Sequence, residues 1–297
     1  MPDMDLWSTV AREIAAASGA PFAISARHGA GGGCINQAYV VEGGGWRYFV
    51  KTNRADRLPM FEAEADGLAE LAQVGAIRVP RPVCSGSAGG SAFLVLEHIE
   101  FGGGGRGGAE RLGAQLAALH RNGAERFGWK RDNTIGATPQ NNDWNDRWVE
   151  FWRERRLGYQ LALAVKNGAG GKLLHEGEKL FDRLPEFFKD YRPVPSLLHG
   201  DLWGGNAAYD ESGAPVIFDP AVYYGDREAD LAMTELFGGF PPAFHAAYRE
   251  AWPLPPGYAV RKTLYNLYHV LNHYNLFGDG YLGQAERMIA SLLAEMK

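Results

Sequence analysis

The chain has 297 residues, 46% of them apolar, and a formal net charge of −5. Such a chain can bury a substantial core, as one large domain or as two packed lobes. Its acidic balance disfavours nucleic acid as a partner, and no apolar run approaches the roughly 20 residues that span a bilayer. We therefore expect a globular cytoplasmic protein, without a nucleic-acid or membrane partner.

The first third of the chain predicts a helix, a small antiparallel sheet and a second helix. Residues 38–42 and 46–52 are rich in β-forming residues, and three glycines between them can form a hairpin turn. Residues 61–72 place apolar side chains at helical spacing, and residues 92–96 form a short apolar run typical of a buried strand. The segment 102–108 is almost all glycine, which indicates a flexible connection. We place the lobe boundary there, with an N-terminal lobe at 1–99 and a C-terminal lobe at 100–297.

The rest of the chain predicts helices with one short β island. The helical pattern covers residues 112–120, the tryptophan-rich stretch 144–152, and segments near 173–189, 228–237 and 258–276. Prolines at 193–195, 241–242 and 253–256 break this pattern. The β island spans residues 197–219, and the candidate chemistry lies there.

Within that island, an acid and an amide lie five residues apart on a loop that leaves an apolar run, in His199-Gly200-Asp201-Leu202-Trp203-Gly204-Gly205-Asn206. A second apolar run ends at Asp219. If residues 207–210 and 215–218 pair across a two-residue Ser212-Gly213 turn, Asn206 lies opposite Asp219. Hard oxygen ligands of this kind suit magnesium bound to nucleotide phosphates.

This spacing resembles the catalytic and metal loops of kinase-like enzymes in the aminoglycoside and choline phosphotransferase branch. By that resemblance Asp201 orients and deprotonates the attacking hydroxyl, while Asn206 and Asp219 hold Mg²⁺ on ATP. The alternative for each residue alone is a loop carboxylate or turn former. The implied fold is α+β: the two-lobed protein-kinase-like fold, with an antiparallel sheet in the N-terminal lobe and a mainly helical C-terminal lobe.

A kinase of this type needs a lysine that contacts phosphate and an acid that faces it. Lys51 ends the strand 46–50, and the following helix offers Glu64 between Phe61 and Leu68 on its inward side. The other acids of that helix, Glu62, Asp66 and Glu70, recur every four residues and are typical of a solvated stripe. Glu64 is therefore the expected partner of Lys51.

Two further segments complete the expected nucleotide site. Gly31, Gly32 and Gly33 precede the first strand and can approach phosphate closely, although a plain flexible turn is an equal alternative. In kinases, main-chain groups between the lobes bind adenine. The resemblance implies that the Glu97 carbonyl and the Ile99 amide do so here.

Beyond the general kinase pattern, the chain resembles the fructosamine kinase family along most of its length. The blocks that carry this resemblance are residues 31–36 (GGGCIN), 49–53 (FVKTN), 60–65 (MFEAEA), 79–82 (VPRP), 127–129 with 132–136 (FGW, DNTIG), 199–206, 224–228 (YGDRE) and 264–268 (LYNLY). The family implies ATP-dependent phosphorylation of the 3-hydroxyl of ketosamines, free or on protein lysines, as a step of deglycation repair. Gly204 departs from the pattern, which leads us to expect serine there.

Three side-chain roles stay open at this stage. Trp203 either stacks on the substrate sugar or packs in the lobe core. Asp226 either attracts the substrate amine or caps a helix, and we favour the cap, with Asp230 as a buried support for the catalytic loop. His199 is expected to brace that loop.

The rival functions are a phosphotransferase for another small alcohol, such as an aminoglycoside or choline, and a non-catalytic kinase-like nucleotide-binding module. The presence of Lys51, Glu64, Asp201, Asn206 and Asp219 disfavours the second rival. The sequence does not decide the preferred ketosamine or the oligomeric state.

Overall fold

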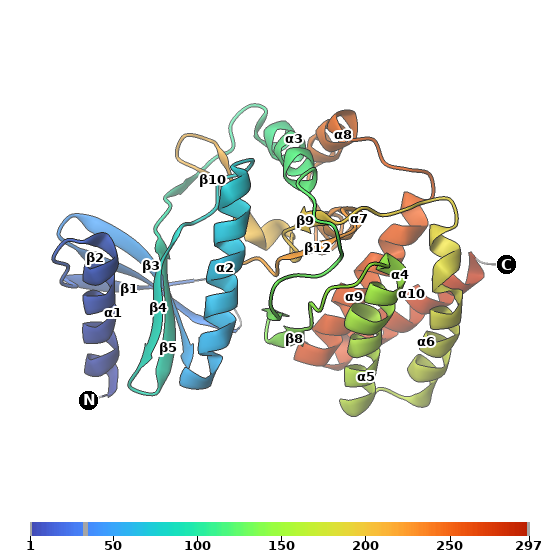
Figure 1. Ribbon diagram of the computed structural model, residues 1–297, viewed down its shortest axis with the longest axis horizontal. Coiled ribbons are helices and arrows are strands. Elements are labelled where there is room, and N and C mark those ends of the chain that lie inside the picture. Colours follow the sequence, from blue (N-terminus) through green and yellow to red (C-terminus); the bar gives the residue numbers. More distant parts are fainter. Residues whose placement is uncertain (1, 32–34, 296–297) are drawn as a thin grey trace. The chain divides into compact units, whose positions relative to one another are not determined.

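The computed structural model describes residues 2–31 and 35–295 of the chain (Figure 1). The residues form two compact units. The first comprises Met1–Gly108 and Ala208–Asp219, and the second comprises Ala109–Ala207 and Pro220–Lys297. The chain therefore returns to the first unit for a short segment between two parts of the second.

The first unit is built on a five-stranded antiparallel sheet in the order β1-β2-β3-β5-β4. Figure 1 shows helices α1 and α2 on opposite faces of this sheet. The elements are α1 (Pro2–Ser18), β1 (Ala26–Ala30), β2 (Gln37–Gly43), β3 (Trp46–Arg54), α2 (Leu58–Val74), β4 (Pro82–Ala88) and β5 (Ser91–Glu97). These bounds confirm the strands and the helix expected in this part of the chain.

Alternation along β3 sends neighbouring side chains to different faces of the sheet. Val50 is fully buried in a cluster with Val10 and Ile14 of α1. Because successive strand side chains point to opposite faces, Lys51 points to the face that α2 covers. The helix packs there through apolar residues that include Phe61 and Leu68.

The β2–β3 hairpin closes through a two-residue glycine turn. Gly43 pairs with Trp46, which leaves Gly44 and Gly45 as the turn residues. Their φ angles are 57° and 82°, the left-handed values that a type I′ turn requires at both positions. Glycine adopts these values without steric cost, so the expected hairpin is confirmed.

A second, smaller sheet in this unit has the order β11-β10-β6. Its strands are β6 (Phe101–Gly102), β10 (Ala207–Asp210) and β11 (Pro215–Ile217). Part of the glycine-rich segment is thus a strand, because Gly102 pairs with Tyr209. This pairing groups the hairpin with N-terminal residues, whereas the sequence assigns it to the C-terminal part.

The β10–β11 hairpin differs from its expected register by one residue. Asp210 N–H donates to the Ala214 carbonyl at 2.9 Å, so the loop has three residues, Glu211 to Gly213. Gly213 has a φ of 80°, the left-handed value at the end of a three-residue hairpin loop. The Asp210 carboxylate accepts hydrogen bonds from Ser212 and Ala214 N–H at 2.9 and 3.0 Å, which stabilises this loop. The prediction of a two-residue turn was wrong, and with it the arithmetic that put Asn206 opposite Asp219.

The second unit is mainly helical and is organised around α9, which packs against α5, α7 and α10. Its helices are α3 (Gly108–His120), α4 (Trp148–Phe151), a π-helical segment (Trp152–Leu157), α5 (Gly158–Lys166), α6 (Gly171–Arg183), α7 (Glu228–Thr234), α8 (Pro242–Ala251), α9 (Tyr258–Phe277) and α10 (Leu282–Ala294). Two short strand pairs accompany them, β7 (Asn133–Ile135) with β8 (Thr138–Gln140) and β9 (Ser196–Leu198) with β12 (Tyr223–Gly225).

Several features of this unit differ from the sequence expectation. The tryptophan-rich helix begins at Trp148 instead of 144. The strands β7 and β8 and the helices α8 and α10 were not predicted. Pro242 was interpreted as a break, but it occupies the start of α8, where proline's fixed φ and missing N–H suit a first helical turn. In the part of the chain that the structure describes, no helix is long and apolar enough to cross a membrane.

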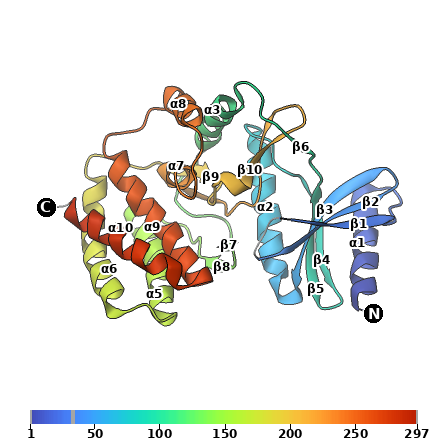
Figure 2. The same ribbon diagram turned by 180° about the vertical axis from the view of Figure 1, so that it is seen from behind.

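Helices α3 and α8 lie side by side in both views and meet at a glycine (Figures 1 and 2). A Cβ placed on Gly113 would lie 2.2 Å from the Phe244 carbonyl oxygen, which is backbone and cannot move aside cheaply.

We expect Gly113→Ala to destabilise the protein by about 1–3 kcal/mol, because the two helices must separate to admit the methyl group. The control is Gly171→Ala in α6, where a Cβ meets no atom within 4 Å. Urea unfolding checks both variants. Equal stabilities would contradict the close approach of α3 and α8.

Candidate functional site

Lys51 is a buried charged residue of the first unit that contacts two carboxylates. Its side chain is 6% exposed, and its Nζ lies 2.5 Å from Glu64 Oε1 and 2.6 Å from Asp219 Oδ1. The contact with Glu64 is the one that the helix pattern predicts. The contact with Asp219 was not predicted, because Asp219 was assigned only to metal binding.

The two carboxylates decide the charge state of Lys51. Burial disfavours the ammonium form, but the charges of Asp219 and Glu64 outweigh burial and raise the pKa of Lys51. Lys51 therefore stays protonated at any physiological pH and presents a fixed positive charge beside Asp219.

The glycine-rich segment leads into β2 close to this lysine. Gly31 has open space around it, and a Cβ placed there would meet no atom within 4 Å. Gly32 and Gly33 lie outside the described residues. The far end of the segment is fastened by Asn53, whose Nδ2 donates to Asn36 Oδ1 at 2.7 Å and to the Ile35 carbonyl at 3.1 Å. Sequence reasoning missed Asn53, although it shares a strand face with Lys51, two residues away.

The residues assigned to adenine lie at the end of β5. Glu97 is the last residue of that strand, and its carboxylate binds Arg78 at 2.8 Å and Arg81 Nε at 3.3 Å. Burial opposes ionisation of Glu97, but the hydrogen bonds from Arg78 and from the Arg81 main chain outweigh it and lower the pKa. Ile99, two residues on, is buried.

The loop that carries Asp201 leaves β9 through a glycine that no other residue can replace without strain. Gly200 has a φ of 84°, and a Cβ there would lie 2.0 Å from the Ala221 carbonyl oxygen. His199 is fully buried, and its Nδ1 accepts a hydrogen bond from Asp201 N–H at 3.3 Å. The histidine thus braces the loop, as expected, and Asp201 follows the glycine directly.

Asp230 of α7 holds the same loop through its main chain. Its carboxylate accepts hydrogen bonds from His199 N–H at 2.7 Å and from Gly200 N–H at 2.8 Å, and it lies 3.1 Å from His120 Nε2. Burial opposes ionisation, but the hydrogen bond and charge of His120 outweigh it and lower the pKa of Asp230. The expected role of Asp230 as a buried support is confirmed.

Asp226 is also buried and faces away from solvent. Its carboxylate accepts hydrogen bonds from Glu228 N–H at 3.0 Å and from Tyr191 at 2.7 Å. It therefore ties the start of α7 to its surroundings, as favoured from the sequence, and does not offer a charge to a substrate amine.

Trp203 lies on the surface of the loop that carries Asp201. It is 38% exposed, so the alternative of a core tryptophan was wrong. A Cβ on Gly205 would lie 2.3 Å from the Trp203 ring, whereas one on Gly204 would meet no atom within 4 Å. The ring thus lies over Gly205, and the serine expected at Gly204 would fit there.

Asn206 is oriented by the loop that precedes it. Its Nδ2 donates to the Asp201 carbonyl at 2.9 Å, and it lies 3.4 Å from Asp201 Oδ2. Because Nδ2 faces Asp201, the amide oxygen of Asn206 points away from Asp201. Among the described residues no cluster of three or more His, Cys, Asp or Glu could hold a metal ion. The Asn206 amide oxygen is a donor of the hard type that magnesium on nucleotide phosphates accepts.

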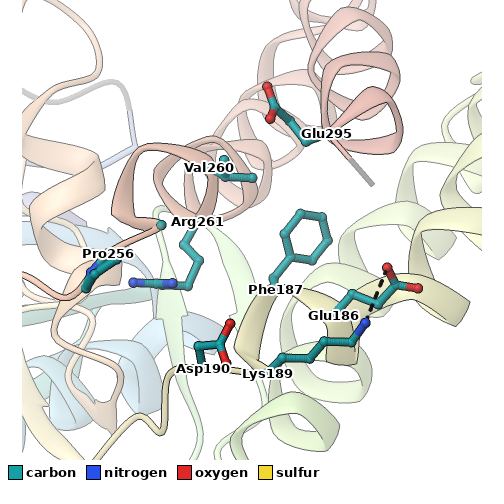
Figure 3. A pocket seen from close by; sticks show the side chains of 9 residues that line it. Glu186, Phe187, Lys189, Asp190, Pro256, Val260, Arg261 and Glu295 are labelled. Atoms are coloured by element: carbon teal, nitrogen blue, oxygen red, sulfur yellow. Dashed lines mark ion pairs between the residues drawn. The ribbon is translucent and has the colours of Figure 1, made fainter. Parts of the chain in front are cut away.

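A pocket of about 320 Å³ lies elsewhere in the second unit (Figure 3). Figure 3 shows Phe187 between Glu295 on one side and Asp190 on the other. The two basic side chains at the pocket both have carboxylate partners, Arg261 with Glu228 at 2.7 Å and Lys189 with Glu186 at 4.0 Å. The pocket is therefore poorly suited to a phosphate, and it contains none of the assigned residues.

Comparison with known proteins decides the family. A model of the fructosamine kinase family matches residues 6–295. The chain belongs to the fructosamine kinase family. A probable ketoamine kinase from Synechocystis sp. is 52% identical over 97% of each chain. A chloroplastic protein-ribulosamine 3-kinase from Arabidopsis thaliana is 45% identical over 90% of this chain and 82% of its own.

Solved structures agree with this assignment. A candidate fructosamine-3-kinase from Haemophilus somnus has a TM-score of 0.89 and 30% identity, over 97% of each chain. An aminoglycoside phosphotransferase in complex with ADP and hygromycin B shares the fold, with a TM-score of 0.64 and 14% identity over 96% of this chain and 98% of its own. The predicted kinase-like α+β fold is confirmed, and the protein is a kinase.

We expect Asp230→Asn to destabilise the protein by about 2–3 kcal/mol, because His199 and Gly200 N–H bind different carboxylate oxygens and asparagine replaces one of them with an NH2 group. The control is Asp182→Asn, on the exposed surface of α6. The folded pKa of Asp230 lies below its ordinary value of 3.8. Its contribution is therefore complete above about pH 4 and is lost as the pH falls through the folded pKa. Urea unfolding at neutral and acid pH should show that the difference in free energy of unfolding between the wild type and Asp230→Asn becomes smaller in acid. A difference independent of pH would contradict the role of the ionised Asp230 carboxylate.

Proposed function

We propose that this kinase transfers the γ-phosphoryl group of ATP to the 3-hydroxyl of a ketosamine. The observation that supports it most is Lys51, a buried ammonium bound by both Glu64 and Asp219. The names of the relatives support the class of acceptor. Phosphorylation at this position is a step toward decomposition of the sugar adduct, so the proposed biological role is deglycation.

The first unit supplies the nucleotide contacts in this proposal. Lys51 binds the α and β phosphates, and Glu64 keeps its ammonium in place. Gly31, Gly32 and Gly33 let the main chain approach the phosphates. The Glu97 carbonyl and the Ile99 N–H bind the edge of adenine.

The second unit supplies the base. Asp201 accepts the proton of the 3-hydroxyl while that oxygen attacks the γ-phosphorus and ADP leaves. Its main chain is bound by His199 and Asn206, which holds the residue in place on the loop. Orientation of this carboxylate matters most, because the loose transition state of phosphoryl transfer demands orientation more than strong deprotonation.

Asn206 and Asp219 are the residues that would hold magnesium. The bound ion neutralises the negative charge that gathers on the phosphates during transfer. Asp219 has a φ of 58°, an uncommon value for a residue with a side chain, and aspartate is among the few that tolerate it. The hydrogen bond to Lys51 helps to keep it there.

Trp203 is the proposed platform for the acceptor. An exposed indole next to the base can cover the apolar face of a sugar while the hydroxyls face polar groups. Free ketosamines and glycated protein lysines both present such a sugar on an amine, and we propose that both are acceptors.

We expect Asp201→Asn to lower kcat for a ketosamine about 10²–10⁴-fold, because the base is lost while the loop contacts remain. The measurement is magnesium-dependent ATP consumption with fructosyl-lysine, ribulosyl-lysine and erythrulosyl-lysine, beside an aminoglycoside and choline. Nucleotide affinity, measured by calorimetry, should stay unchanged and serves as the control. Turnover of another alcohol alone would discard the ketosamine acceptor, and tight ATP binding without any turnover would favour a binding module.

We expect Gly205→Ala to raise KM for the ketosamine about three- to tenfold, because the new methyl group displaces the Trp203 ring from its position. Gly204→Ala, one residue away, has open space and should leave KM unchanged. KM for ATP should not change in either variant. Equal ketosamine KM values for the two variants would argue against Trp203 as the sugar platform.

A further inference from the structure

Arg78 contacts three separate parts of the first unit. Its Nη1 donates to Asp210 Oδ2 at 2.5 Å, at the end of β10. Its Nη2 donates to Glu97 Oε1 at 2.8 Å, at the end of β5. Its main-chain carbonyl accepts from Ile217 N–H at 3.0 Å, in β11. One residue therefore joins both strands of the β10–β11 hairpin to the strand end assigned to adenine.

The hairpin needs such an anchor because it carries Asp219. Strand β11 ends at Ile217, two residues before Asp219, whose left-handed φ is costly unless its surroundings enforce it. Lys51 also supports this end of the hairpin through its contact with Asp219. Strand β6 contributes two residues beside β10 (Figure 2). Phe101, which is 54% exposed, stacks on Phe218 with 5.4 Å between the ring centroids.

The planar guanidinium fork suits Arg78 for joining two carboxylates. Asp210 also binds its own loop through Ser212 and Ala214. Loss of the Arg78 side chain would thus leave the hairpin loop formed but less firmly held relative to β5. The Arg78 side chain is 40% exposed, so its ion pairs contribute little to global stability and variants should fold.

We propose that Arg78 is a positioning residue that couples the adenine-binding end of β5 to the hairpin carrying the metal-binding carboxylate Asp219. This inference rests on the proposed function for the roles of Glu97 and Asp219. Adenine contact with the Glu97 main chain then favours the hairpin position in which Asp219 can serve the metal. By reciprocity, metal at Asp219 favours nucleotide at β5.

The chain supplies a matched control. Arg81 binds the same Glu97 carboxylate, at 3.3 Å, but its side chain is 79% exposed. Of the two acids that Arg78 joins, Arg81 contacts only Glu97. Arg78→Met and Arg81→Met each remove one charge from Glu97. Only the first removes the connection to Asp210.

The first measurement is amide hydrogen exchange of residues 208–219 in the full chain without nucleotide. Arg78→Met should speed exchange there about tenfold, Arg78→Lys should have a smaller effect because one ammonium cannot bridge both acids, and Arg81→Met should match the wild type. Equal exchange in Arg78→Met and Arg81→Met would overturn the anchoring role.

The second measurement is the affinity for a non-hydrolysable ATP analogue by calorimetry, with magnesium and with chelator. Arg78→Met should reduce the gain in affinity that magnesium provides by about tenfold, while adenosine affinity stays unchanged. An undiminished magnesium gain would overturn the coupling. Absence of nucleotide binding in the wild type would instead refute the proposed function, and the exchange result would still decide whether Arg78 anchors the hairpin.

Discussion

The organisation of the first unit depends on one buried ammonium. Lys51 lies on a strand face covered by α2, where an unpaired charge would be very costly. Helix α2 meets this constraint with Glu64, and the segment Ala208–Asp219 meets it with Asp219. The Lys51 ammonium, which would bind phosphate, thus also connects β3, α2 and the β10–β11 hairpin. A rigid, preorganised cation of this kind suits phosphoryl transfer, in which catalysis depends mainly on positioning and electrostatics.

In the second unit, a buried carboxylate is likewise satisfied by the groups around it. Asp230 is buried and ionised because the N–H groups of His199 and Gly200 and the ring of His120 satisfy it. The main chain of the loop that carries Asp201 is therefore held by hydrogen bonds to a buried carboxylate. Gly200 completes this geometry, since only a residue without a Cβ can pass so close to Ala221. Asp201, the proposed base, is then a short distance along the chain from His199 and Asn206, which bind its main chain.

The hairpin between Asn206 and Asp219 shows how much depends on a local turn. A glycine that can adopt a positive φ and an Asp210 carboxylate that binds its own loop select a three-residue connection. That choice shifts the register by one residue. The position of Asp219 is then determined by contacts of the hairpin with Arg78, β6 and Lys51, more than by pairing within the hairpin itself.

The sequence by itself determined the features that are local or periodic. Helical spacing selected Glu64 from four acids as the partner of Lys51, and the spacing from His199 to Asn206 indicated a kinase-like loop. Only the tertiary structure revealed the bond between Lys51 and Asp219, the anchors Asn53 and Arg78, and the start of α8 at Pro242. The physical reason is the separation of the contacting residues along the sequence. Periodicity records which face of an element is buried, whereas a bond between side chains 168 positions apart leaves no periodic trace and exists only once the chain has folded.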